Sequence, residues 1–220
     1  MSVRERLAEV RDGIERASAR AGRDPVSITL VAVTKVFPAA MIRDAYEAGL
    51  RDFGENYVQE FETKAPELAD LTEARFHLIG HLQSNKAKKA AELFQAIQTV
   101  DSAKLARRLN DAARPLDVMI EVKLAGEAAK SGADPAELPA LIDAVRGCNH
   151  LRLSGLMTMP PWSEDAELSR PYFRRLRELA EKLALPNLSM GMSHDFEIAI
   201  AEGSTCVRVG TGIFGERPKP

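Results

Sequence analysis

Small and hydroxyl residues that could bind an anion occur in two places near the end of the chain. Ser193 follows the apolar stretch 187–190, and a Gly-Thr-Gly sequence at 210–212 follows the stretch 205–209. Backbone N–H groups in such turns, and at the start of a helix, attract phosphate. The pattern favours a phosphate site over two structural turns, although the Ser193 hydroxyl also suits the N-cap of a helix expected around residue 196.

Lys35 is the first charged residue after the apolar, β-branched stretch 28–34. A lysine directly after a buried strand can act as an amine nucleophile toward a carbonyl group. It can also extend its ammonium group into solvent, which is the commoner arrangement at strand ends. Position alone favours the second interpretation and leaves the first open.

Arg208 lies between Val207 and Val209, so its guanidinium is expected in an apolar setting. A buried arginine needs an acceptor or a counter-charge. The partner could be a carboxylate of a neighbouring strand, such as Glu55, or a bound anion.

Two histidines lie near the end of the third expected strand. His77 lies inside it and is expected to be a hydrogen-bonded core residue, whereas His81, at its exit, is an acid–base candidate. The sequence has no Ser/His/Asp arrangement, no metal-ligand spacing and no Gly-x-Gly-x-x-Gly motif. Cys148 and Cys206 are far apart and are expected to be reduced. We therefore expect no metal site.

Strand and helix patterns alternate along the chain. An amphipathic helix over 2–21 comes first, with Val3, Leu7, Val10 and Ile14 at helical spacing. Eight strands without a linker predict an α/β fold, a single (β/α)₈ TIM barrel with its ligands at the C-terminal strand ends. A doubly wound open sheet is the competing architecture. The expected strands are 28–34, 50–54, 75–80, 95–100, 116–122, 151–156, 187–190 and 205–209, and the clearest further helices are 39–48, 102–113, 135–146 and 165–184.

Composition describes an ordinary globular chain. The 220 residues are 45% hydrophobic, and 30 basic against 32 acidic residues give a net charge of −2. That balance provides no overall attraction to nucleic acid or to an anionic membrane. The charged beginning of the chain lacks a signal-peptide core, and no stretch is long enough to span a bilayer. We expect a cytoplasmic protein that binds neither nucleic acid nor membrane.

With the lysine, the phosphate cluster and the arginine placed, the sequence resembles the pyridoxal 5′-phosphate (PLP) homeostasis protein family. The resemblance runs nearly end to end. It is carried by the segments 31–35, 53–60, 77–86, 100–102, 126–127, 130–132, 155–157, 189–195 and 203–215.

The resemblance implies one PLP-binding domain over 1–220, with an N-terminal helix (1–22) and a barrel (28–215). This barrel would be similar to the N-terminal domain of alanine racemase, which is fold type III among PLP proteins. By the same resemblance, PLP forms a covalent aldimine on Lys35. Its phosphate is held by Ser193, Gly210 and Thr211, its pyridine nitrogen faces Arg208, and Asn56 lies close to the ring.

Two segments depart from the family pattern. Lys123 stands where many relatives are expected to have asparagine, and Val36-Phe37-Pro38 follows Lys35 where a polar residue is frequent. A loop around 125–134 contains Lys130, a second amine that could capture the aldehyde, although a solvated loop lysine explains it as well.

An arginine beside the pyridine nitrogen disfavours its protonation, because two cations would meet in a low-dielectric pocket. An unprotonated ring is a poorer electron sink, which argues against carbanion chemistry. We therefore expect a monomeric PLP-binding protein without catalytic residues, which holds the cofactor and delivers it to PLP-dependent apoenzymes.

Two enzyme alternatives remain open. The first is an amino-acid racemase with His81 or Tyr57 as the second base. The second is a Schiff-base aldolase that uses Glu55 or Asp101 as its acid–base group.

Overall fold

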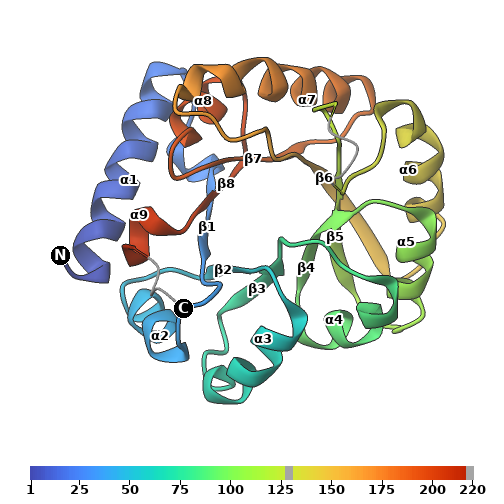
Figure 1. The fold of residues 1–220 in the computed structure, drawn as a ribbon, viewed down its shortest axis with the longest axis horizontal. Coiled ribbons are helices and arrows are strands. Elements are labelled where there is room, and N and C mark those ends of the chain that lie inside the picture. Colours follow the sequence, from blue (N-terminus) through green and yellow to red (C-terminus); the bar gives the residue numbers. More distant parts are fainter. Residues whose placement is uncertain (127–130, 217–220) are drawn as a thin grey trace.

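Eight parallel strands form a closed barrel in chain order, with β8 paired to β1 (Figure 1). The computed structural model describes residues 1–126 and 131–216. The TIM barrel expected from the sequence is confirmed, and the open doubly wound sheet is wrong because both edges of the sheet are paired. The strands are β1 (Thr29–Val33), β2 (Asp52–Glu55), β3 (Arg75–Leu78), β4 (Ala96–Val100), β5 (Leu116–Glu121), β6 (Leu151–Met157), β7 (Asn187–Met192) and β8 (Cys206–Val209).

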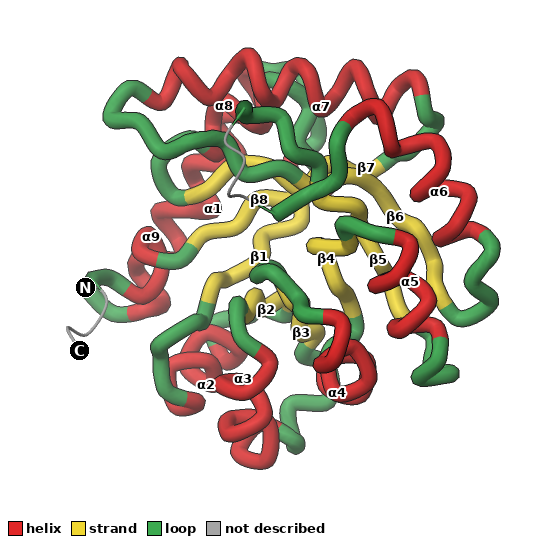
Figure 2. Tube along the Cα trace, turned by 45° about the vertical axis from the view of Figure 1, so that its right-hand side comes forward, coloured by secondary structure: helices red, strands yellow, loops and turns green. Residues whose placement is uncertain are grey.

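Helices surround the strands on the outside of the barrel (Figure 2). Consecutive residues such as Val31 and Ala32 are both 0% exposed, because one faces the barrel interior and the other the helix layer. The helices are α1 (Val3–Arg20), α2 (Ala39–Glu47), α3 (Val58–Lys64), α4 (Ala87–Leu93), α5 (Ala103–Asn110), α6 (Leu138–Arg146), α7 (Arg170–Lys182), α8 (Phe196–Ala201) and α9 (Thr211–Phe214).

The first helix is fixed at its start by a capping box. The Ser2 side chain accepts from the Glu5 backbone N–H, and the Glu5 side chain accepts from that of Ser2. Its apolar residues, including Leu7, Val10 and Ile14, are buried. In Figure 1 this helix lies beside α8 and α9, so it covers the place where β8 meets β1.

Four phenylalanines join α3 and α4 to the barrel wall. The Phe61 ring on α3 lies 4.5 Å from the Phe76 ring on β3 and 4.9 Å from the Phe94 ring, measured between centroids. Phe53 on β2 stacks on Phe76 at 5.6 Å. These contacts fix α3 against β2 and β3, which becomes important for the residues that flank Lys35.

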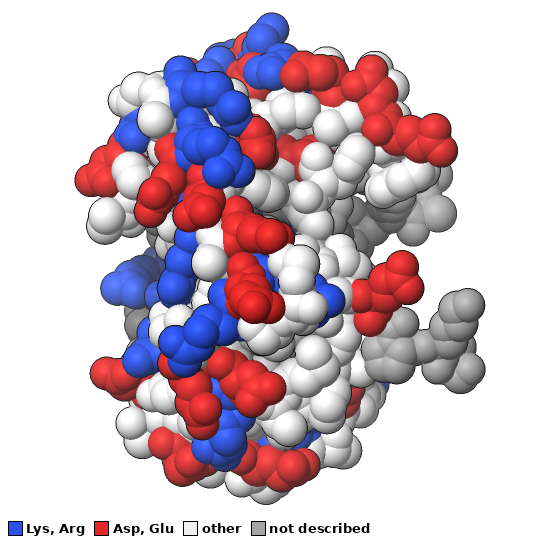
Figure 3. All heavy atoms as spheres, turned by 90° about the vertical axis from the view of Figure 1, so that its left-hand side faces the viewer, with Lys and Arg blue, Asp and Glu red and all other residues white. Residues whose placement is uncertain are grey.

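The outer surface carries charges of both signs. On the face drawn in Figure 3, basic and acidic side chains are interspersed and do not form a field of one sign. No helix within 1–126 and 131–216 is long and apolar enough to cross a membrane.

Strands β6 and β7 approach each other at Gly155, which pairs with Asn187. A Cβ atom on Gly155 would lie 2.0 Å from the Asn187 carbonyl oxygen, so any side chain there forces the strands apart. We expect Gly155→Ala to lower the free energy of unfolding by about 1–3 kcal/mol. Chemical denaturation measures this loss. Gly147→Ala, which meets only ordinary contacts at 3.4 Å or more, is the control and should change stability little.

Candidate functional site

A pocket of about 270 Å³ lies at the C-terminal ends of the strands, where barrels of this type bind their ligands. The six residues singled out from the sequence all line it, although they come from four separate parts of the chain. They are Lys35, Asn56, Ser193, Arg208, Gly210 and Thr211.

Lys35 lies in a turn directly after β1 and is partly buried. The turn begins at the buried Thr34, whose N–H donates to the Gly54 carbonyl oxygen at 2.9 Å. It continues through Val36, whose φ of 64° lies in the left-handed region. That conformation is rare for a β-branched residue, so the residue after Lys35 is strained.

Asn56 follows β2 and lies against the exit of β3. A Cβ atom on Gly80 would be 2.3 Å from the Asn56 carbonyl oxygen, so the absence of a side chain at Gly80 lets the two strand ends approach. Close packing of the backbone thus fixes where Asn56 enters the pocket.

Ser193 joins the exits of β7 and β8. Its hydroxyl oxygen accepts a hydrogen bond from the Gly210 N–H at 3.3 Å. The prediction that Ser193 caps the following helix is wrong, because α8 begins at Phe196 and its N-cap is Asp195. The Asp195 carboxylate instead accepts from the Met192 N–H at 2.7 Å, which tightens the turn before the helix.

Gly210 and Thr211 form the beginning of the short helix α9. Its first internal hydrogen bonds are donated by Ile213 and Phe214 to the Gly210 carbonyl oxygen. The N–H groups of Thr211 and Gly212 precede these bonds, and N–H groups in such a position are suited to an anion. Together with the Ser193 hydroxyl, they form a compact group of donors at the edge of the pocket.

Arg208 is 2% exposed and points into the barrel. Its guanidinium donates to the Ser189 hydroxyl and, at 3.0 Å, to the Thr158 carbonyl oxygen. Burial lowers the pKa of this guanidinium, which still remains charged. Pairing with Glu55 is wrong: within the described part of the chain, no carboxylate forms an ion pair with Arg208, and Glu55 pairs with Lys64 on the outer side of β2.

A chain of buried hydrogen bonds leads from Arg208 through the barrel. The Ser189 hydroxyl donates to the Gln98 side-chain oxygen at 2.6 Å, and the Gln98 amide nitrogen lies 3.1 Å from Nδ1 of His77. Nε2 of His77 lies 2.8 Å from the Asp52 carboxylate. An arginine can only donate, so the Ser189 hydroxyl accepts from Arg208 and donates its own proton to the Gln98 oxygen. The Gln98 amide then donates to Nδ1 of His77, which leaves the His77 proton on Nε2, where it donates to Asp52. His77 is therefore a hydrogen-bonded core histidine, as the sequence predicted.

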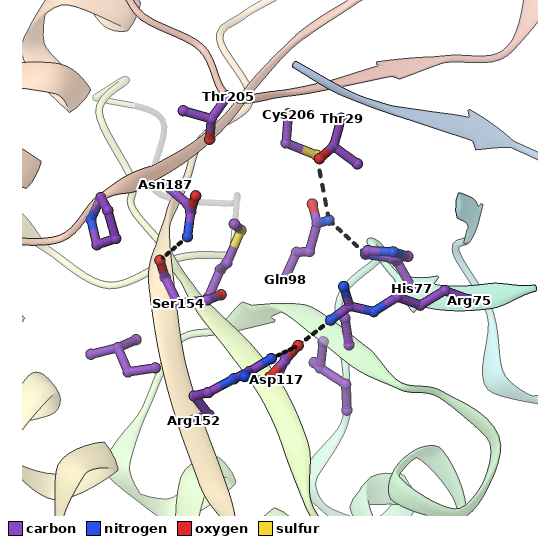
Figure 4. A pocket seen from close by; sticks show the side chains of 15 residues that line it. Thr29, Arg75, His77, Gln98, Asp117, Arg152, Ser154, Asn187, Thr205 and Cys206 are labelled. Atoms are coloured by element: carbon purple, nitrogen blue, oxygen red, sulfur yellow. Dashed lines mark hydrogen bonds and ion pairs between the residues drawn. The ribbon is translucent and has the colours of Figure 1, made fainter. Parts of the chain in front are cut away.

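The far end of this chain reaches a second pocket of about 390 Å³ at the opposite mouth of the barrel (Figure 4). Arg75 and Arg152 both bind the Asp117 carboxylate there. No residue of the predicted site lies in this pocket. In TIM barrels that end serves stability, and these ion pairs accordingly join β3, β5 and β6.

A chamber of about 780 Å³ adjoins the first pocket and shares walls with it, including Met159, Trp162 and Met192. It contains Glu121, which sequence reasoning missed, together with His81 and Lys123. Glu121 is 4% exposed, and both carboxylate oxygens accept from the Ser131 hydroxyl. Burial raises the pKa of this carboxyl group. An acidic residue within the apolar run 118–122 was the available signal.

The other acid–base candidates lie in two places. His81 lies 3.7 Å from the Asp101 carboxylate in an ion-pair position. Tyr57 is 59% exposed and, like Glu55, lines neither the pocket nor the adjoining chamber. Lys130 lies outside the described residues. Among the residues that are described, no group of three side chains could hold a metal ion.

Ser189 connects Arg208 to Gln98, so its hydroxyl stabilises two buried polar groups at once. We expect Ser189→Ala to lower the free energy of unfolding by about 1–3 kcal/mol, because it leaves the Gln98 oxygen without this donor. Ser18→Ala is a matched control: Ser18 is also 0% exposed, but its hydroxyl has no hydrogen-bond partner in the described structure. Equal losses for both variants in denaturant titrations would contradict the role of Ser189.

Comparison with known proteins shows the family to which this chain belongs. The family model described as alanine racemase, N-terminal domain, matches residues 6–218. Curated relatives named pyridoxal phosphate homeostasis protein include one from Pseudomonas aeruginosa, 48% identical over 98% of this chain and 96% of its own length. A relative with the same name from Aquifex aeolicus is 44% identical over 99% of both chains.

Solved structures give the same result. PipY of Synechococcus elongatus, solved without PLP, is 42% identical and superposes with a TM-score of 0.88 over 97% of this chain and 100% of its own. The same protein with PLP bound is 41% identical, with a TM-score of 0.85 over the same shares of the two chains. Alanine racemase from Corynebacterium glutamicum, 19% identical with a TM-score of 0.68, shares the fold over 97% of this chain and 62% of its own. The chain therefore belongs to the pyridoxal phosphate homeostasis protein family, whose barrel is that of the alanine racemase N-terminal domain.

Proposed function

We propose that the chain binds PLP in the pocket at the C-terminal strand ends and holds it as a Schiff base on Lys35. The observation that carries this proposal is the convergence of three unlike groups on one pocket. These are the primary amine of Lys35, the anion-binding donors at Ser193, Gly210 and Thr211, and the buried guanidinium of Arg208. PLP has an aldehyde, a phosphate and a ring nitrogen, so each group has a counterpart. The relative solved with PLP bound, which is 41% identical, supports PLP as the ligand of this pocket.

The residues present also fit the cofactor physically. Thr211 and Gly212 direct N–H groups that the short helix α9 does not use, which suits a phosphate more than a neutral group. Arg208 contacts only neutral acceptors, the Ser189 hydroxyl and the Thr158 carbonyl oxygen. Its charge is thus available to a lone pair such as that of a pyridine nitrogen. Asn56 would lie beside the ring.

The role that follows is that of a binding protein rather than an enzyme. PLP chemistry depends on the ring acting as an electron sink, and a buried guanidinium beside the ring nitrogen disfavours its protonation. The proposed function is therefore PLP homeostasis: a monomeric cytoplasmic protein, with residues 1–220 as one binding unit, protects the reactive aldehyde and transfers it to PLP-dependent apoenzymes.

Lys35→Ala should abolish covalent attachment. We expect the purified protein, incubated with PLP, to show the visible absorbance of a Schiff base and to retain the label on Lys35 after borohydride reduction and peptide mapping. Lys35→Ala should lose both signals, because the amine is gone. Lys89→Ala, which removes an exposed surface lysine, serves as the control and should keep them. A label on other lysines with none on Lys35 would refute the assignment.

A second function is favoured by one observation, the buried carboxylate of Glu121 in the chamber that shares walls with the PLP pocket. Burial raises the pKa of this carboxyl group, which favours the protonated form that a general acid needs. With His81 nearby, such a group could serve an amino-acid racemase. Tyr57, the other candidate for the racemase base, lines neither the pocket nor the chamber, and the same holds for Glu55, a candidate for the aldolase.

Exchange of the α-hydrogen of amino acids with deuterated solvent separates the two functions. We expect the PLP-loaded protein to show no exchange at turnover rates for a panel of amino acids, because an unprotonated ring stabilises a carbanion poorly. NMR of the amino acids after incubation measures this. Exchange that is lost in both Lys35→Ala and Glu121→Gln would instead establish the enzyme.

A further inference from the structure

The turn that carries Lys35 is held on both sides by a cluster of three charged residues, Glu55, Glu60 and Lys64. Lys64, the last residue of α3, is 8% exposed, and its ammonium group makes three hydrogen bonds. It donates to the Thr34 carbonyl oxygen at 3.0 Å, to Glu55 Oε1 at 3.0 Å and to Glu60 Oε1 at 2.6 Å. An ammonium group has three donors, so all of them are used. One of the three fixes the residue that precedes Lys35.

The residue that follows Lys35 is fixed by the same cluster. The Val36 N–H donates to Glu60 Oε1 at 2.6 Å, the same oxygen that accepts from Lys64. This bond holds Val36 at a φ of 64°, a conformation that a β-branched side chain disfavours. Without the bond, the backbone would relax toward negative φ and turn Lys35 away from its present direction.

Helix α3, which carries Glu60 and Lys64, packs closely against the barrel. Phe61, on the same helix, is 2% exposed and packs against Phe76 and Phe94. Glu60 and Lys64 lie four residues apart, on either side of that anchor, and form an i,i+4 pair. The position of the turn is therefore set by a helix that itself contributes no residue to the pocket.

Stability alone does not explain the cluster. Glu55 is 0% exposed, and its Oε2 atom has no hydrogen-bond partner in the described structure. Burial raises the pKa of its carboxyl group, and Lys64 opposes that shift. Buried ion pairs of this kind are often no more stable than apolar residues of the same volume, and in some proteins they instead specify one conformation. Here the conformation they specify is that of residues 34–36.

We propose that Lys64 and Glu60, supported by Glu55, are positioning residues that hold the strained turn and so direct the Lys35 amine into the pocket. The inference rests on the proposed function, since it assigns a role to residues around the same lysine. It extends that function to a helix outside the pocket.

The test compares Glu60→Ala with Glu62→Ala, two glutamates on one helix. Glu62 pairs with Lys89 at the surface and does not touch the turn. In the cofactor-free protein, hydrogen exchange followed by NMR should show about tenfold or greater loss of protection at the Val36 amide in Glu60→Ala only. Protection of the Ala32 amide in β1 should not change, which shows that the barrel is intact. Unchanged protection at Val36 would overturn the proposal without reference to PLP.

The consequence for binding is measured by PLP titration of the same variants. Glu60→Ala should raise the dissociation constant about tenfold or more, because the turn is free to leave its strained conformation. Glu62→Ala should bind like the wild type. If the wild type itself shows no Schiff base, the proposed function fails; if the wild type binds and the two variants are equal, only the positioning role fails.

The variant Val36→Gly separates an effect of Glu60 on the position of the Lys35 turn from an effect on the stability of the whole protein. Glycine adopts positive φ without strain, so in a Val36→Gly background the turn depends less on the bond from Glu60. We expect Glu60→Ala to weaken PLP binding less in that background than in the wild type, a non-additivity that a double-mutant cycle detects. Equal losses in the two backgrounds would contradict the role of backbone strain.

Discussion

The pairing of β8 with β1 is the constraint on which the rest of the structure depends. It aligns Val31 with Arg208 and Ala32 with Val209, although these residues are far apart in the sequence. Because parallel strands in register end at the same level, Lys35 after β1 and Gly210 after β8 emerge side by side at one mouth of the barrel. The pocket exists only because the sheet closes, and α1 covers the outside of the closure together with α8 and α9.

Closure of the barrel also buries two cations, Lys64 and Arg208, and their surroundings differ. The Lys64 ammonium group donates to three acceptors, two carboxylates and the Thr34 carbonyl oxygen, so its charge stabilises the backbone at residue 34. Arg208 donates to a hydroxyl and a carbonyl oxygen, and no described carboxylate forms a direct ion pair with it, although Asp195 and Glu121 act on its charge from a distance. In a low-dielectric interior a buried cation without a direct counter-ion influences the groups beside it strongly.

Much of this could be read from sequence. Local apolar patterns predict the eight strands and the first helix. Because parallel strands of a barrel end at the same mouth, the patterns also predict that Lys35, Arg208 and the glycines after β8 lie near one another. The errors concern side chains whose partners are distant. The helix N-cap that the sequence offered as an alternative role for Ser193 is wrong, because its hydroxyl accepts from Gly210 on the next strand exit. Glu55 was one possible partner for Arg208, yet it lies on the outer side of β2 with Lys64. Glu121 was overlooked although it lines the chamber.

The sequence by itself determined which residues form strands and helices, where each strand ends and which polar residues stand at those ends, because these depend on neighbours within a few positions. Only the tertiary structure decided which side of a strand each polar residue faces and which distant group it meets. That choice depends on barrel register and on helix packing, which join residues such as Val36 and Glu60 or Ser189 and Gln98 across long stretches of chain. A hydrogen bond or an ion pair is sensitive to distances of less than 1 Å, and such precision arises only when the whole barrel is closed and packed.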